Sequence, residues 1–210
     1  MLRLKLRLKI VQSKLLKNEI YKNVFTNKEI EDLYQAIDIK QREKTSTNPF
    51  YAQKTWFVPL PESVINKINS VAKEIYDEPV TLKEVSFARY SKEYGEMPIL
   101  TPHFDNAFPS PRVTIDIQIK SNIDWPIVVN NQSFTLKDND ALTFSGTNQI
   151  HWREYKEFKD DDFIEMIFAH FSIDSEPSYQ ENYKSEIAES LVVGGINFAR
   201  TTIRKLLNID

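Results

Sequence analysis

A chain of 210 residues, with 41% hydrophobic and 12% aromatic residues and only four glycines, has the composition of one folded globular domain rather than of a disordered or fibrous protein. Its formal net charge of −3 gives no reason to expect nucleic acid or an anionic membrane as an obligatory partner. Because the chain has no cysteine, disulfides, thiolate metal sites and cysteine nucleophiles are excluded, and any metal must use nitrogen and oxygen ligands.

The first ten residues, MLRLKLRLKI, alternate apolar and basic side chains with a period of two, which predicts a half-buried strand. A basic helix on a membrane surface is the alternative, although the helical period that it would need is absent. The leucines do not form the continuous apolar core of a signal peptide, and no run approaches the length of a membrane span. We therefore expect a cytoplasmic protein without membrane contact.

Two amphipathic helices are predicted next. Thr26 is followed three residues later by Glu29, which is the spacing of a capping box and predicts a helix to about residue 38. In the segment LPESVINKINSVAKEIY, Pro61 stands in the first turn and apolar residues recur at helical intervals, which predicts the second helix. The polar stretch between the helices, residues 41–56, lacks periodicity and is predicted to be a loop near a site.

From about residue 80 to 173 the pattern changes to about eight short β-rich pieces separated by Pro, Asn, Asp and Gly. Strands in succession without intervening helices predict a mainly β sandwich or barrel, a jelly roll being one such closure. The final segment is predicted to be helical and amphipathic on both sides of Gly194 and Gly195, so it would dock on its own sheet or pair with another copy in a homodimer. We expect a single domain over 1–210, with an N-terminal strand and helices over 20–79, the β core over 80–173 and a helical tail over 174–210.

Two of the three histidines and one aspartate have the spacing of metal ligands. In an extended segment residues i and i+2 point the same way, so His103 and Asp105 present an imidazole and a carboxylate on one side. His151, in the strand-like segment QIHWREY, would complete a set of two histidines and one carboxylate, which leaves positions on a ferrous ion open. The same ligands also bind zinc or manganese. The structural alternative is that Asp105 caps a turn and the histidines only form hydrogen bonds.

The order of the motifs FARYSKEYGEMPILTPHFDN, RVTIDIQIK, LKDNDALTFSG, HWREY and FIEMIFAHF resembles the 2-oxoglutarate and iron(II)-dependent oxygenases, within them the prolyl 4-hydroxylase-like branch. The segment YKNVFTNKEIEDLYQAI is similar to the start of that branch's first helix, so the resemblance covers about residues 20–173. It implies a double-stranded β-helix, a jelly roll of the cupin kind, with flanking helices. It also implies that His103, Asp105 and His151 are the catalytic iron(II) ligands, with 2-oxoglutarate and molecular oxygen as cosubstrates and ascorbate as a further candidate cofactor.

One residue type that such oxygenases usually carry is missing. An Arg or Lys about ten residues after the second histidine normally pairs with the far carboxylate of 2-oxoglutarate, but the sequence there is DDDFIEMIF. Arg153 is the first substitute, because in a continuing strand it points to the same side as His151, although it could instead form a surface ion pair. Lys120, on the polar face of RVTIDIQIK, is the second substitute, with a solvated strand end as its alternative. Tyr90 and Thr114 are further candidates for hydrogen bonds to the cosubstrate.

These observations predict a hydroxylase that couples 2-oxoglutarate decarboxylation to oxidation of a C–H bond in a small-molecule or peptide substrate. The missing cation leaves a second interpretation open, a non-catalytic or differently metallated cupin-like binding module that has lost 2-oxoglutarate binding. Nucleic acid is disfavoured as a substrate by the even charge balance, and a serine hydrolase by the lack of a GxSxG turn. Rim loops at 41–56 and 106–111 would select the substrate. His170, in an apolar strand, is predicted to be a packed, hydrogen-bonded residue.

Overall fold

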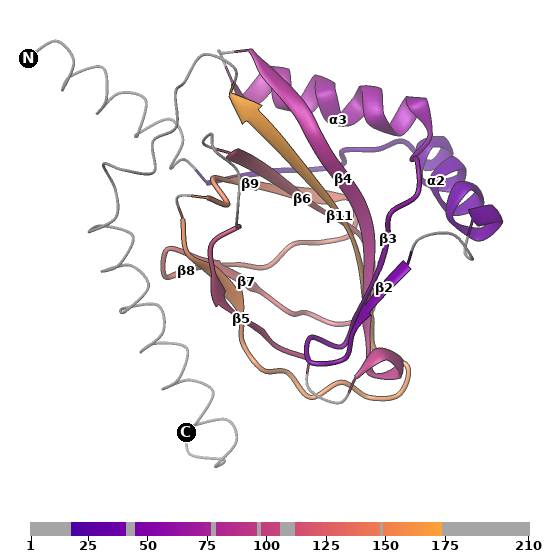
Figure 1. Ribbon diagram of the computed structural model, residues 1–210, viewed down its shortest axis with the longest axis vertical. Helices are drawn as coiled ribbons and strands as arrows, with labels where there is room; N and C mark the ends of the chain where they lie inside the picture. Colours follow the sequence, from indigo (N-terminus) through magenta and orange to yellow (C-terminus); the bar gives the residue numbers. More distant parts are fainter. Residues whose placement is uncertain are drawn as a thin grey trace, which may run out of the picture.

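The computed structural model describes residues 18–40, 45–76, 79–95, 98–105, 112–147 and 149–173. Within these ranges two antiparallel β-sheets face each other (Figure 1). The large sheet has the strand order β1-β9-β6-β11-β4-β3-β2, and the small sheet has the order β5-β10-β7-β8. The strands of the large sheet are β1 (Glu19–Tyr21), β2 (Thr45–Asn48), β3 (Gln53–Trp56), β4 (Val80–Ser91), β6 (Arg112–Ser121), β9 (Asp140–Phe144) and β11 (Phe163–Ile173). Those of the small sheet are β5 (Leu100–His103), β7 (Ile127–Val129), β8 (Gln132–Phe134) and β10 (His151–Arg153).

From β4 onward the chain alternates between the two sheets. Strands β4, β6, β9 and β11 lie in the large sheet, and the strands that come between them, β5, the β7–β8 hairpin and β10, lie in the small sheet. A chain that winds in this way between two facing sheets forms a double-stranded β-helix. The fold class predicted from the sequence is therefore confirmed.

The side chains of β6 separate two cores. Ile115 and Ile117 belong to an outer core between the large sheet and the helices. Thr114 and Asp116, which alternate with them, face a cavity between the two sheets. An inner core, which includes Trp125 and other apolar residues of both sheets, fills the space around that cavity. The period of two along this strand therefore brings polar side chains into the interior, where a site can be built.

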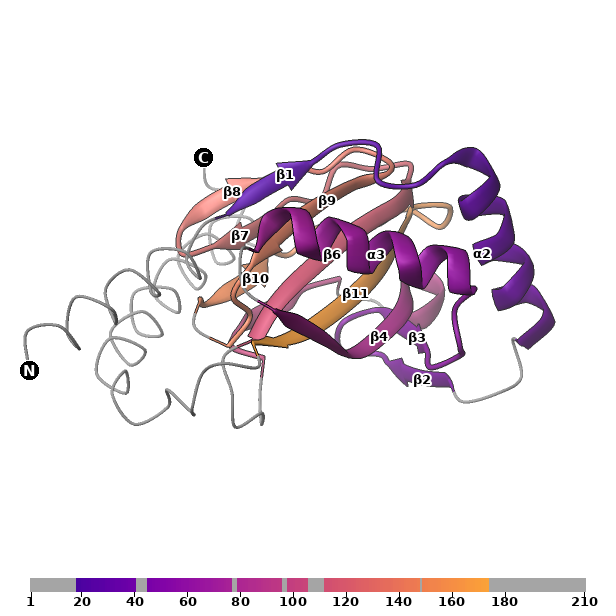
Figure 2. The same cartoon turned by 90° about the horizontal axis from the view of Figure 1, so that it is seen from above.

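Helices α2 (Asn27–Lys40) and α3 (Glu62–Ile75) lie on the outer face of the large sheet, away from the small sheet, as Figure 2 shows from a second direction. The predicted capping box is present, because the Thr26 amide donates to a carboxylate oxygen of Glu29 at 2.7 Å and the Glu29 amide donates to the Thr26 hydroxyl at 3.3 Å. Pro61 directly precedes α3, which buries Val64 and Ile68 among other apolar residues. Neither described helix is long and apolar enough to cross a membrane.

The prediction of a loop over residues 41–56 is wrong for its described part. Strands β2 and β3 form a hairpin that extends the large sheet beyond β4, with Trp56 opposite Phe87, and a short 3-10 helix, η1 (Lys92–Tyr94), follows β4. All four residues of β2 are exposed, so this edge strand has no apolar alternation by which it could be detected. The predicted strand at 1–10, the rim loop at 106–111 and the helical tail with its homodimer contact lie outside the described residues.

The side chain of Asn139, just before β9, forms hydrogen bonds with the segment that precedes α2. It accepts a hydrogen bond from the Phe25 amide at 2.8 Å and donates one to the Phe25 carbonyl at 2.7 Å. The backbone of Asn139 has a φ of 65°, in the left-handed region that asparagine tolerates better than most residues. Asn130, in the β7–β8 turn, has a φ of 47° and an exposed side chain.

Asn139→Ala is expected to lower the free energy of unfolding by about 3 kcal/mol, because two hydrogen bonds are lost and alanine must adopt a left-handed conformation. Asn130→Ala, which adds only the backbone strain, is the matched control and should cost about 1 kcal/mol. Urea unfolding of both variants measures the difference. Equal destabilisation by the two substitutions would show that the Phe25 hydrogen bonds contribute nothing.

Candidate metal centre

His103, Asp105 and His151 converge at one end of the space between the sheets. His103 ends β5 and His151 begins β10, and these strands pair with the two histidines directly opposite each other. Their ring centroids are 4.2 Å apart, and Asp105 follows β5 by two residues. One ligand atom from each of the three residues lies within 4.8 Å of the other two. The structure thus brings together the three residues that the sequence predicts as metal ligands.

Hydrogen bonds to the backbone orient both imidazoles. The Nδ1 atom of His103 lies 2.8 Å from the Thr101 carbonyl oxygen, and Nδ1 of His151 lies 3.1 Å from the Gln149 carbonyl oxygen. A carbonyl oxygen only accepts, so each Nδ1 carries a hydrogen and each Nε2 is left as the potential ligand atom. The two Nε2 atoms lie 3.9 Å and 3.4 Å from the same Asp105 oxygen, Oδ1. This is the orientation that metal-binding histidines require.

The protonation states of the three groups suit a cation. Burial and the charge of His151 lower the pKa of His103 to about 4, so its Nε2 lone pair is available at neutral pH. Burial alone would raise the pKa of Asp105, but hydrogen bonding to His151 and the charges of the surrounding histidines outweigh it and hold the pKa below its usual range. For His151, burial opposes protonation, while the hydrogen bond and charge of Asp105 raise its pKa. A divalent ion would compete with any proton on His151 for the same Nε2 atom, so metal binding should weaken as the pH falls.

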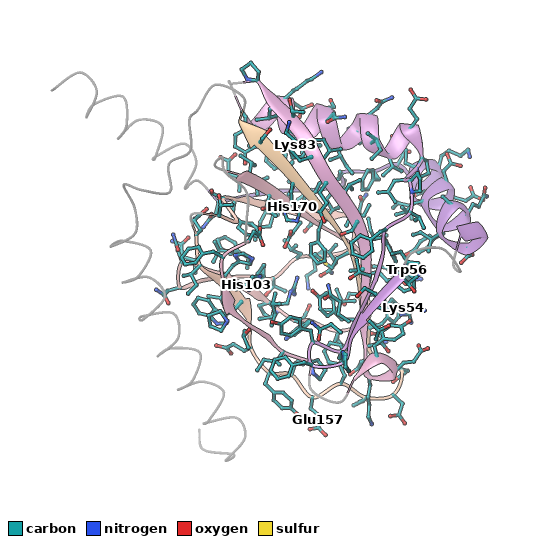
Figure 3. All side chains as sticks on the ribbon, in the orientation of Figure 1. Lys54, Trp56, Lys83, His103, Glu157 and His170 are labelled. Carbon is teal, nitrogen blue, oxygen red and sulfur yellow. The ribbon has the colours of Figure 1, made fainter. Side chains whose placement is uncertain are left out.

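The second oxygen of Asp105, Oδ2, is held by Thr114. The Thr114 hydroxyl donates to Oδ2 at 3.0 Å and lies 3.3 Å from Nδ1 of His170, which is itself 3.7 Å from Oδ2. His103 and His170 come from opposite sheets (Figure 3). The prediction that His170 is packed and hydrogen bonded agrees with this arrangement. For Thr114 the sequence predicts a hydrogen bond to the cosubstrate, which stays a prediction. Its described hydrogen bond is to Oδ2 of Asp105, and the other oxygen, Oδ1, faces the two imidazoles.

Gly146, which sequence reasoning did not identify, allows Asp105 to reach this position. Its carbonyl accepts the Asp105 amide hydrogen bond at 2.8 Å. A Cβ atom at residue 146 would lie 1.7 Å from Oδ2 of Asp105 and 2.5 Å from Oγ1 of Thr114. The φ of Gly146 is not positive, so the requirement for glycine comes from the close approach and not from backbone strain. A lone glycine just after a strand, in LTFSG, was the available signal.

A cavity of about 220 Å³ opens beside the three ligands. Tyr90 lines it, and its predicted hydrogen bond to the cosubstrate stays a prediction. Burial raises the pKa of this phenol, which is therefore neutral. The β2–β3 hairpin contributes Tyr51 and Gln53, which the loop prediction had not resolved. Gln53 donates to the Tyr90 hydroxyl at 3.1 Å, and the Tyr51 hydroxyl lies 3.3 Å from that of Thr101. The remaining lining residues are Leu100, His103, Asp105, Thr114, Asp116, Phe144, His151, Phe168 and His170.

The two candidate cations lie in different environments. Arg153 is 2% exposed, and its guanidinium donates to the Trp125 carbonyl and lies 3.9 Å from the sulfur of Met166 on β11. In the described part of the chain, no carboxylate lies within ion-pair distance of this guanidinium. Lys120 is exposed and does not line the cavity, because the β6–β11 register shifts between Gln118 and Lys120 and turns the lysine outward. Arg153 does not line the cavity either, but it is buried between the sheets, and for that reason it alone is retained as the candidate anchor.

Comparison with solved structures shows the same fold in several oxygenases. HygX from Streptomyces hygroscopicus, with nickel and 2-oxoglutarate bound, matches with a TM-score of 0.56 and 10% identity over 82% of this chain and 89% of its own. The non-haem α-ketoglutarate-dependent epimerase SnoN from nogalamycin biosynthesis matches with a TM-score of 0.59 and 14% identity over 75% and 78% of the two chains. A prolyl hydroxylase from Trichoplax adhaerens, in complex with a hypoxia inducible factor peptide, matches with a TM-score of 0.54 and 14% identity over 75% and 83%.

At these identities the comparison establishes the fold. No protein-family model and no curated protein sequence matches the chain. The chain is thus a double-stranded β-helix protein with the architecture of 2-oxoglutarate-dependent oxygenases, prolyl hydroxylases among them, as the sequence resemblance implied. The candidate metal centre is therefore assigned from the residues of this chain and not from the matched structures.

Gly146→Ala should weaken metal binding by about tenfold or more, because the added methyl group displaces the Asp105 carboxylate and its Thr114 hydrogen bond. Isothermal titration with Mn²⁺ measures the affinity, and a thermal melt of the metal-free variant shows whether folding is retained. Ser133→Ala, at an exposed position of β8, is the control and should bind Mn²⁺ normally. Unchanged affinity in a folded Gly146→Ala variant would contradict the role assigned to this glycine.

Proposed function

We propose that the chain is an iron(II)- and 2-oxoglutarate-dependent oxygenase in which His103, Asp105 and His151 hold the metal. The observation that carries the proposal is the convergence of two oriented Nε2 atoms and one carboxylate oxygen within 4.8 Å. Two imidazoles and a carboxylate on one face of an ion are characteristic of non-haem iron oxygenases, since they leave coordination positions open. The structural relatives HygX and SnoN, crystallised with nickel or iron and with 2-oxoglutarate or α-ketoglutarate, support this choice.

When bound, an iron(II) centre with 2-oxoglutarate supplies the oxidising chemistry, and the chain supplies positioning and shielding. Asp105 is kept ionised and directed at the ion by Thr114, and the two imidazoles are fixed by backbone carbonyls. Apolar and aromatic side chains such as Phe144 and Phe168 line the cavity beside the ligands, and a bound cosubstrate and substrate would complete the exclusion of water there. Exclusion of water protects reactive species from side reactions.

Arg153 is the proposed partner of the far carboxylate of 2-oxoglutarate. The described partners of this buried guanidinium are a carbonyl oxygen, a thioether and the Trp125 ring, whose centroid lies 5.1 Å away, and none of them is an anion. Its positive charge is therefore only partly compensated, and an anionic ligand would complete the compensation. Tyr90 and Asp116 both line the cavity, and both are near enough to Arg153 to oppose the lowering of its pKa by burial. Arg153 itself is not among the lining residues, and we propose that its guanidinium, buried beside two groups of the cavity wall, meets the far carboxylate when 2-oxoglutarate is bound.

The reaction proposed is hydroxylation of a small molecule or of a peptide side chain. The cavity of about 220 Å³ is smaller than the roughly 300–1,000 Å³ of sites that enclose a drug-sized ligand. Only the group to be oxidised would then enter beside the cosubstrate, while most of the substrate would remain outside. The relatives include one solved with hygromycin B and one with a peptide fragment, so the fold serves both substrate types.

Arg153→Met should abolish the visible charge-transfer band that the wild-type protein gives with Fe²⁺ and 2-oxoglutarate under anaerobic conditions, because methionine replaces the cation with an apolar side chain of similar length. Lys120→Ala is the matched control, and this variant should give the full band because Lys120 is exposed. Survival of the band in Arg153→Met would place the anchor elsewhere.

Wild-type protein with Fe²⁺ should consume 2-oxoglutarate slowly without added substrate, and Asp105→Ala should not, because it lacks one metal ligand. Succinate formation measures this turnover directly. A wild-type protein that binds Fe²⁺ but neither binds nor consumes 2-oxoglutarate would support the alternative, a metal-loaded binding module with an oxygenase fold.

A further inference from the structure

Asp116 is a buried carboxyl group that the proposed metal site does not use. It lies in the middle of β6 and is 4% exposed, and its side chain lines the cavity together with the metal ligands. Within the described ranges it has neither a hydrogen bond nor an ion pair. A carboxyl group that is largely buried in this state at a cavity wall is costly when ionised, unless a ligand satisfies it.

The surroundings of Asp116 determine which charge state is stable. Its neighbours in the sheet are Leu142 on β9 and Phe168 on β11, which offer no polar partner. The titratable and charged groups that share or border its cavity are Tyr51, Tyr90, His103, Asp105, His151, Arg153 and His170. Burial raises the pKa of Asp116 to about 7, and although His151 and Arg153 oppose this shift, the charge of Asp105 adds to it.

We propose that Asp116 is a protonated hydrogen-bond donor to 2-oxoglutarate, beside the guanidinium of Arg153. This inference rests on the proposed function. A divalent ion held by one carboxylate keeps one positive charge, and Arg153 adds a second, so the two negative charges of 2-oxoglutarate balance the cavity only if Asp116 is neutral. An ionised Asp116 would repel the cosubstrate, whereas the neutral acid places a donor where a carboxylate arrives.

Two substitutions separate hydrogen bonding from charge. Asp116→Asn keeps the shape and an N–H donor without the ability to ionise, and Asp116→Leu keeps a similar volume without a donor. Titration of 2-oxoglutarate into the Mn²⁺-loaded full-length protein under anaerobic conditions measures binding without turnover. We expect Asp116→Asn to bind within about threefold of wild type and Asp116→Leu to bind about tenfold more weakly, with Mn²⁺ affinity unchanged in both.

Proton uptake gives a readout that a merely structural role would not change. In wild type, 2-oxoglutarate binding at about pH 8 should take up a proton, because the acid must be protonated to donate, whereas at about pH 6 it should take up none. The binding enthalpy, compared in buffers of different ionisation enthalpy, measures this uptake. Asp116→Asn should remove it, which tests the proposal even if Asp116→Leu does not fold.

Three results would overturn the inference. Equal loss of 2-oxoglutarate binding in Asp116→Asn and Asp116→Leu would mean that the carboxylate itself is needed, as a partner of Arg153. Markedly tighter binding in Asp116→Asn at about pH 6, where the proposal has wild type already protonated, would mean that Asp116 is ionised there and repels the cosubstrate. If the wild-type protein binds Mn²⁺ but not 2-oxoglutarate, the proposed function fails and the inference with it, which distinguishes this case from the first two.

Discussion

The candidate site depends on one carboxylate that is ionised although it is largely buried. Removal of a carboxylate from water costs several kcal/mol. The partners that offset this cost at Asp105 are the Thr114 hydroxyl, the imidazole of His170 and the two imidazoles of the candidate ligands, rather than a lysine or arginine. Because both imidazoles give their Nδ1 hydrogens to the backbone, their Nε2 atoms are directed at the carboxylate. Three electron-rich atoms can share this position only around a proton or a cation, so the pairing of β5 with β10 sets the spacing of a cation site.

The parts that sequence reasoning predicted are those governed by local rules. The spacing of His103 and Asp105 follows from the period of two in an extended chain, and the start of α2 follows from the reciprocal hydrogen bonds of Thr26 and Glu29. Arg153 is buried, as the count from His151 predicts, but all three residues of β10 are buried and the β5–β10 register shifts between His151 and Arg153, so alternation alone does not account for it. The strand alternation between the sheets was inferred from the resemblance, and the order of the described strands confirms it.

The parts that were missed depend on contacts between distant segments. The β2–β3 hairpin is polar and exposed, so nothing in its pattern reveals that it pairs with β4 and brings Tyr51 and Gln53 to the cavity. The role of Gly146 is to leave space for Asp105, a residue 41 positions earlier that reaches it only in the folded chain. Lys120 was misplaced because a register shift interrupts the alternation of β6, and a single extra residue reverses the face of every residue after it.

The position of a charge in space, and not its offset in the sequence, decides whether a dicarboxylate can bind. The side chains of β11 that face the inner core or the cavity, Ile164, Met166, Phe168 and His170, include no lysine or arginine. The Arg153 guanidinium nevertheless comes within 3.9 Å of Met166, because β10 faces β11 across the interior and an arginine side chain is long enough to cross it. The Arg153 guanidinium, which belongs to the small sheet, thus lies beside β11, the last strand of the large sheet. The absence of a cation at the usual sequence offset is therefore weak evidence for a lost cosubstrate site, because a buried cation reaches the same region from another strand.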